Sequence, residues 1–174
     1  IYGVPFKSKL FNSEKKGFPI IRIRDLKEQE FKTYTTEKLK KGYLIKNGDI
    51  VVGMDGEFKP YIWGRGQAWL NQRLCVFENL RTKGSMFLYF TIKPLLNIVE
   101  KTELATTVIH IGKKDFDNFE LNLPGNDILD KFDTITYPIY QKIINNQMEN
   151  QRLSALRDAL LPELMNGKID IKEV

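Results

Sequence analysis

The sequence has little of what most catalytic sites are built from. It contains one cysteine and one histidine among 174 residues, Cys75 and His110. A lone cysteine excludes a disulfide within the chain, and two residues this far apart give weak support for a nucleophile with its base. Paired cysteines, HExxH, GxxxxGK[ST] and the loop motifs of amino-methyltransferases are missing. The sequence therefore predicts no catalytic residue, no metal site and no cofactor.

Long hydrophobic runs are missing as well. The longest apolar stretch, residues 86–99, is interrupted by Lys93 and Pro94. It is shorter than the roughly 20 residues that a transmembrane helix needs, and we expect no signal peptide. We therefore expect a cytoplasmic protein without a membrane span. Cys75 lies in an apolar run, which predicts a buried structural thiol.

The charge is distributed unevenly along the chain. Residues 1–125 carry 21 Lys and Arg against 14 Asp and Glu, a balance of +7, whereas residues 126–174 carry 6 against 8, a balance of −2. A basic region attracts the phosphate backbone of nucleic acids, although so small an excess is also common in proteins that bind none. Taken alone, the charge is a modest argument for DNA.

The first 125 residues have the pattern of short strands and loops. Within residues 18–24, Ile21 and Ile23 alternate with Arg22 and Arg24, so the two arginines would share one face of the strand. The turn signal Asn47-Gly48 precedes an apolar run. The sequence predicts an α/β fold of the α+β type: one globular domain at residues 1–125, with a mixed twisted sheet and flanking helices, then a long coiled-coil-forming helix and turn at residues 126–174. We expect strands at residues 18–24, 49–54, 70–77, 106–111 and 119–123, a loop or hairpin at 53–69, and a helix near 85–100.

The C-terminal segment carries a heptad pattern. We expect a helix that Asn126 caps and Pro162 ends. Its apolar positions recur every seven residues, with a second seam beside the first, which is typical of a coiled coil. A terminal helix folded back on its own domain is the alternative, but Lys142 and Glu149 interrupt the second seam. The predicted interface residues are Phe132, Ile135, Ile139, Asn146, Leu153, Leu156 and Leu160.

Several segments resemble a known family. LRDALLPELMNGKIDI (residues 156–171) resembles the end of the conserved helix of type I restriction–modification specificity subunits. YGVPFKSKLFN (2–12), GFPIIRIRDL (17–26), NGDIVVGMDGEF (47–58), AWLNQRLCVF (68–77) and ATTVIHIGKKDFDNFELNLP (105–124) resemble successive stretches of that family's target-recognition domain.

The resemblance implies a non-catalytic subunit that recognises double-stranded DNA. It implies docking to adenine methyltransferase (modification) subunits and a restriction subunit, which carry out the chemistry. Family members usually have two recognition domains and two conserved helices, whereas this chain has one of each. A half-subunit of this kind could pair with a second copy through its helix, and a symmetric dimer would read a symmetric site.

Residues of the type that contact DNA are concentrated in a few segments. Arg, Asn and Gln can bind base edges bidentately, and Lys and Arg can hold phosphates. Alternatively, Trp63 and Trp69 anchor the core and the polar residues are simply solvated. The candidate DNA-binding residues are Arg22, Arg24, Lys59, Tyr61, Trp63, Arg65, Gln67, Asn71, Gln72, His110, Lys113 and Lys114.

Two other functions are open on the sequence. The chain could be an assembly module that binds protein partners through its helix and does not read DNA. Glu57 and Lys59 also match the tail of a metal-dependent nuclease pattern, for which Asp25 or Asp49 would have to supply the upstream acid. Such short patterns often arise by chance.

Overall fold

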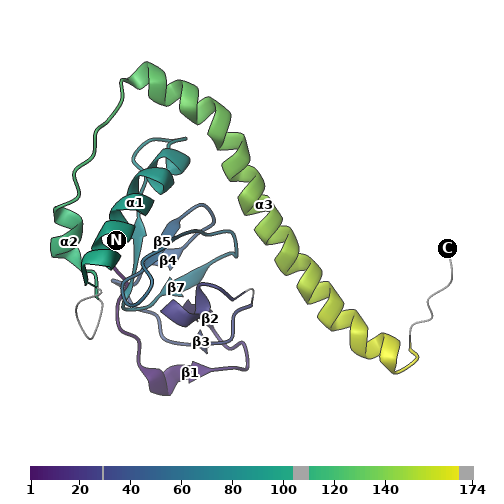
Figure 1. Cartoon of the computed structure of the whole chain (residues 1–174). Helices are drawn as coiled ribbons and strands as arrows, with labels where there is room; N and C mark the ends of the chain where they lie inside the picture. Colours follow the sequence, from purple (N-terminus) through teal and green to yellow (C-terminus); the bar gives the residue numbers. More distant parts are fainter. Residues whose placement is uncertain (29, 104–109, 169–174) are drawn as a thin grey trace.

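In the computed structural model, which describes residues 1–28, 30–103 and 110–168, short strands form two sheets (Figure 1). The strands are β1 Phe11–Asn12, β2 Phe18–Ile21, β3 Tyr34–Thr35, β4 Leu44–Ile45, β5 Ile50–Gly53, β6 Pro60–Ile62, β7 Ala68–Leu70 and β8 Leu74–Phe77. The larger sheet has the order β1-β3-β2-β7-β4, and β2 and β7 pair in parallel. The smaller sheet is antiparallel, with β5 between β6 and β8.

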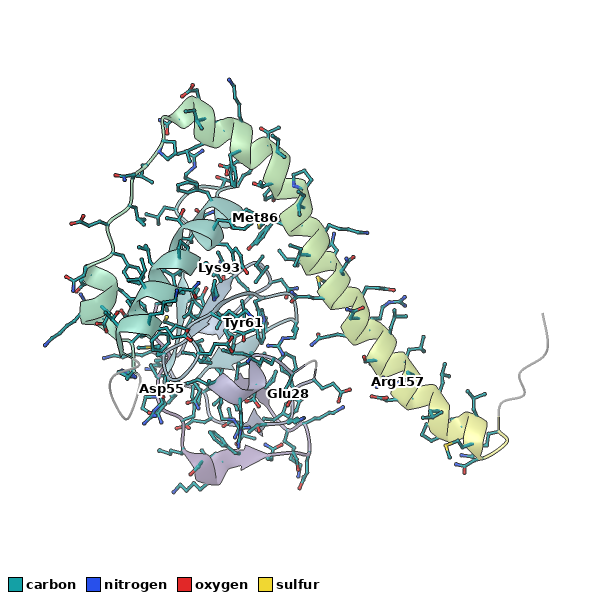
Figure 2. All side chains as sticks on the ribbon, in the orientation of Figure 1. Glu28, Asp55, Tyr61, Met86, Lys93 and Arg157 are labelled. Atoms are coloured by element: carbon teal, nitrogen blue, oxygen red, sulfur yellow. The ribbon has the colours of Figure 1, made fainter. Side chains whose placement is uncertain are left out.

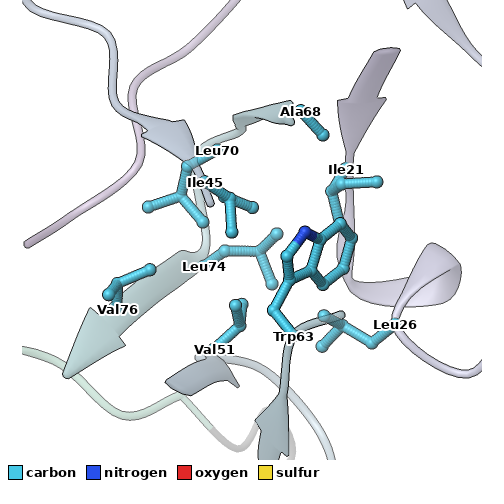
Figure 3. Close-up of a cluster of buried hydrophobic side chains, with 9 residues drawn as sticks. All are labelled: Ile21, Leu26, Ile45, Val51, Trp63, Ala68, Leu70, Leu74 and Val76. Carbon is cyan, nitrogen blue, oxygen red and sulfur yellow. The ribbon is translucent and has the colours of Figure 1, made fainter. Parts of the chain in front are cut away.

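A single apolar cluster joins the two sheets (Figure 3). Ile21, Ile45 and Leu70 come from the larger sheet, whereas Val51 and Leu74 come from the smaller one. Trp63 fills the space between them and is only 1% exposed. Its indole N–H donates to the carbonyl of Gly66, so the buried ring keeps a partner for its polar atom.

Several strand predictions need correction. The strand predicted at residues 18–24 is β2, which ends at Ile21. Residues 23–25 form a short 3-10 helix, η2 Ile23–Asp25. The Asp25 carboxylate caps the start of this helix by accepting a hydrogen bond from the backbone N–H of Arg22. The run at residues 70–77 contains two strands separated by a turn in which Arg73 has a φ of 66°. Residues 119–123 are not a strand. Of the strand expected at 106–111, residues 106–109 lie outside the described residues, and His110 forms an isolated bridge with Asp55.

Helix α1 Ser85–Glu103 confirms the helix predicted near residues 85–100 and continues through Pro94. It covers the smaller sheet. Ile92 and Leu96 pack with Ile50 and Val52 of β5 and with Cys75. Cys75 is 2% exposed, and burial raises the pKa of its thiol to about 12. The predicted burial of this thiol is confirmed.

Helix α3 Asn126–Met165 extends well beyond the sheets (Figure 1). It is longer than expected, because Pro162 is accommodated within its last turns. Gly125 rather than Asn126 is the N-cap residue, and the Asn126 side chain instead accepts a hydrogen bond from Arg81. Among the described helices, none has the length and apolar character needed to cross a bilayer. The predicted α/β class with a long C-terminal helix is confirmed.

Candidate nucleic-acid interface

Strand directions bring several segments to one edge of the domain. Because β2 and β7 are parallel, the residues that follow Ile21 and Leu70 emerge at the same end. The backbone N–H of Asn71 donates to the carbonyl of Ile21, which ties these two exits together. β5 ends there too, because the N–H of Met54 donates to the carbonyl of Arg73.

Asp55 connects the segments at this edge. Its carboxylate lies 2.5 Å from Nδ1 of His110 and 2.7 Å from a guanidinium nitrogen of Arg73. Burial alone would raise the pKa of Asp55, but the bonds from His110 and Arg73 outweigh it and hold the pKa below its ordinary value. His110 and Arg73 are themselves exposed, so Asp55 orients two polar side chains that face solvent.

Two lysines begin the short helix α2 Lys113–Asp117, which starts three residues after His110. The helix is fixed to the domain by Phe116, whose ring stacks on Tyr2 with 6.2 Å between ring centroids. Lys113 forms a 2.6 Å ion pair with Asp117, which raises the pKa of its ammonium group. Both Lys113 and Lys114 are exposed. We call six exposed basic or polar residues of these segments the recognition edge: Arg24, Gln72, Arg73, His110, Lys113 and Lys114.

Three candidates are not available at the surface, which corrects the expectation that they face DNA. Trp63 is a core residue, and Asn71 is 8% exposed with its side-chain oxygen accepting from the N–H of Gln72. Arg65 is 7% exposed, lies 4.0 Å over the Trp63 ring and donates to the carbonyls of residues 25, 26 and 28. Burial lowers the pKa of its guanidinium to about 10. Arg65 therefore packs on Trp63 and bonds to a neighbouring loop, and its guanidinium does not face a DNA duplex.

The remaining candidates lie apart from the recognition edge or have partners. Arg22 bonds to Asp25 at 3.0 Å and to Thr33, so it is committed within the domain. Lys59 is exposed and 3.7 Å from Glu57, and Tyr61 is half-buried. Gln67 is exposed in the connection between β6 and β7. The pairing expected for Arg22 and Arg24 on one strand face is wrong, because the strand ends before both.

Sequence reasoning missed Arg73 and the role of Asp55. The sequence predicts one continuous strand at residues 70–77, and nothing distinguishes Arg73 within such a strand. The polar triplet Asn71-Gln72-Arg73 between two apolar runs was the available turn signal. The contact between Asp55 and His110 joins residues 55 positions apart and had no local signal.

The acidic residues of the nuclease alternative have partners of their own. Asp25 pairs with Arg22, and Asp49 accepts from the hydroxyl of Tyr43 and the N–H of Lys46. Glu57 pairs with Lys27 at 2.5 Å. Within residues 1–28, 30–103 and 110–168, no group of three potential metal ligands is present.

Helix α3 has one face on the domain and one in solvent. Leu129, Tyr140 and Ile144 are buried, and Phe132 packs on Phe87 of α1. Phe132 therefore belongs to the inner face, which corrects its assignment to an outer interface. The other predicted interface residues are exposed on the helix: Ile135, Ile139, Asn146, Leu153, Leu156 and Leu160.

The chain combines one mixed sheet, one antiparallel sheet and a long helix that extends beyond them. Residues 3–154 match the family described as the type I restriction modification DNA specificity domain, and the chain belongs to this family. It is 31% identical over 172 residues to the type I restriction enzyme EcoBI specificity subunit of Escherichia coli, covering 96% of this chain and 36% of that protein. It is 27% identical over 171 residues to the HindI specificity subunit of Haemophilus influenzae, covering 87% of this chain and 35% of that protein.

Solved structures show the same fold. The HsdS subunit from Thermoanaerobacter tengcongensis superposes with a TM-score of 0.54 at 16% identity, over 97% of this chain and 42% of that one. A chain from a study of complex assembly and conformational transition of the type I R-M system gives 0.55 at 18% identity, over 94% of this chain and 42% of that one. The chain thus spans about a third of the length of the curated relatives it matches.

Proposed function

We propose that this chain recognises a specific sequence in double-stranded DNA, as one recognition unit of a type I specificity subunit. The observation that carries the proposal is the recognition edge, where Asp55 orients His110 and Arg73 beside Gln72. Arginine and glutamine suit base edges, and Arg24, Lys113 and Lys114 suit the flanking phosphates. Family membership supports the same function.

The proposal assigns no chemistry to the chain itself. Methylation and cleavage would belong to an adenine methyltransferase subunit and a restriction subunit that dock on it, and the complex would act in the cytoplasm, where its DNA is. The exposed apolar side chains of α3 support docking, either to those partners or to a second copy of the chain.

A binding selection tests DNA recognition. The purified chain is incubated with a pool of randomised duplexes at two salt concentrations, and bound duplexes are sequenced. We expect a short sequence to be enriched, and we expect the double variant Gln72→Ala and Arg73→Ala to lose that enrichment while keeping its melting temperature. Binding without enrichment at either salt concentration would favour the alternative of an assembly module that does not read DNA.

A further inference from the structure

The first part of α3 is fastened to the domain at widely spaced points. Arg81, in the loop before α1, bonds to the first turns of the helix. The hydroxyl of Tyr140 donates to the carbonyl of Gly48, and Nε2 of Gln147 donates to the carbonyl of Ile62 at 3.1 Å. Figure 2 shows Met86, at the start of α1, on the side of α1 that faces α3, and Met86 packs with Tyr140 there.

Arg81 fixes the rotation of the helix about its own axis. Its guanidinium is 2.8 Å from Asp130 and 3.1 Å from Asp133, two residues on one helix face. The Asp133 side chain is only 6% exposed, so a rotated helix would leave a buried carboxylate without its partner. The loop that presents Arg81 is itself held, because the side chain of Asn79 bonds to both the N–H and the carbonyl of Arg81.

Gly64 fixes how closely the helix approaches. A Cβ at this position would lie 2.9 Å from the backbone carbonyl oxygen of Ile144 and 2.9 Å from Cβ of Gln147. Backbone and Cβ atoms cannot move aside as the end of a flexible side chain can. An alanine would therefore have to push α3 away from the domain.

The direction of the helix matters because its last buried side chain is Ile144. Beyond Gln147, Arg157 still meets the domain through an ion pair with Glu30, 3.8 Å away, but both of these side chains are exposed. From Gln147 to Met165 the helix continues for about 27 Å at 1.5 Å per residue, so a tilt of about 10° would displace its end by about 5 Å. That displacement exceeds the rise of about 3.4 Å between successive base pairs of DNA. A joint of this kind can therefore decide a spacing to within one base pair.

We infer that Arg81 and Gly64 are positioning residues that hold α3 at one angle to the recognition edge, and so set the distance at which a second recognition unit meets the DNA. The role in spacing rests on the proposed function, because it requires that the chain binds DNA. The rigidity of the joint can be measured without DNA.

The first test measures the joint directly. Spin labels are attached to the full chain at Ser13→Cys and Ala159→Cys, with Cys75→Ala as background, and their distance distribution is compared in the parent, Arg81→Ala and Gly64→Ala. A matched control is Gly53→Ala, since a Cβ there has no neighbour closer than 3.5 Å. We expect a narrow distribution in the parent and the control, and a broadened one or a shift of several ångströms in the two joint variants. Unchanged distributions would overturn the inference, and Arg81→Ala decides the result if Gly64→Ala does not fold.

The second test measures spacing. Duplexes that carry two half-sites separated by spacers of different lengths compete for the assembled complex. We expect the parent to select one spacer, and the joint variants to accept additional spacers with the same half-site sequence. Unchanged spacer selection, despite altered distances, would overturn the role in spacing. If the parent selects no duplex at all, the proposed function fails and the spacing role with it, whereas the label distances still decide whether the joint is rigid.

Discussion

The two halves of α3 share one heptad pattern and have different surroundings. In the docked half, residues 126–147, four side chains are buried against the domain: Leu129, Asp133, Tyr140 and Ile144. In the outer half, residues 148–165, no side chain is buried, although Leu153, Leu156 and Leu160 continue the apolar seam. The four buried side chains lie outside the predicted seam, of which Ile135 and Ile139 are exposed in the docked half as well. The heptad spacing thus predicted the helix, but not the face that packs on the domain.

The largest expected effect is on assembly through the outer half. Replacing Leu153 and Leu160 with Asp places charges on the exposed seam, and burying unpaired charges in a helix interface should weaken association on the order of a hundredfold or more. The stability of the isolated chain should not fall, because both positions are solvated. Light scattering and co-purification with the methyltransferase subunit measure association. An unchanged mass and undiminished co-purification would remove the interface role of the outer half.

The docked half should instead respond through stability. Ile144→Ala creates a cavity against Tyr140 and Met86, which we expect to cost about 2 to 4 kcal/mol and to lower the melting temperature by about 5 to 15 °C. The matched control, Leu156→Ala, removes a half-exposed side chain and should cost less than about 0.5 kcal/mol. Equal losses in thermal melts of the two variants would erase the distinction between the halves.

A base-reading residue should affect the choice of sequence and neither stability nor assembly. If Gln72 contacts a base edge, Gln72→Ala should cost about 1 to 3 kcal/mol on the preferred duplex and relax selectivity at one position. Titration against preferred and scrambled duplexes measures both quantities. Gln67→Ala is the control, since Gln67 is also an exposed glutamine but lies away from the recognition edge. The assignment of the edge is wrong if Gln67→Ala has the larger effect.

A phosphate contact should fail differently from a base contact. Lys114→Ala should weaken binding to all duplexes alike and reduce the slope of log K against log salt by about 1. Lys113→Ala should change the slope less, because Asp117 already neutralises Lys113. Titrations over a range of salt concentrations give the slopes. Salt-independent affinity changes in both variants would show that α2 does not meet DNA.

The smallest expected effect is on the pH dependence of stability. The pKa of Asp55 is lowered in the folded state, so its contribution is present above the ordinary carboxyl pKa and is lost as the pH falls through the lowered value. At neutral pH the free energy of unfolding of the parent should exceed that of Asp55→Asn by less than about 1 kcal/mol, and this difference should disappear well below about pH 4. Melts across this range test the sign. A difference that grows in acid would contradict the assigned pKa shift.

Local patterns in the sequence were sufficient for much of the fold. The alternation and turn signals predicted β5 and α1, and the heptad spacing predicted α3, because each depends on neighbouring residues. The break at Arg73 and the early end of β2 at Ile21 were missed. Both are decided by pairing partners distant in the sequence, which apolar periodicity does not report.

The candidate site was predictable only in part. Chemical type alone selected Gln72, His110 and the lysines of α2, which the structure gathers on one side of the domain. The same criterion selected Arg65, whose guanidinium is enclosed by Trp63 and three carbonyls. Residue type alone cannot separate an arginine that binds a ligand from one that binds a loop of its own domain, because the same guanidinium N–H donors serve both purposes.

Hydrogen–deuterium exchange on the full chain, with and without a duplex of the selected sequence, tests the central claim most directly. We propose that the recognition edge binds DNA, whereas the outer half of α3 is free to dock a protein partner. We predict slower exchange at residues 22–24, 72–73 and 110–114 and unchanged exchange at residues 148–165. The proposal would be contradicted if slower exchange were confined to residues 148–165. It would also be contradicted if a duplex bound and exchange at the recognition edge did not change.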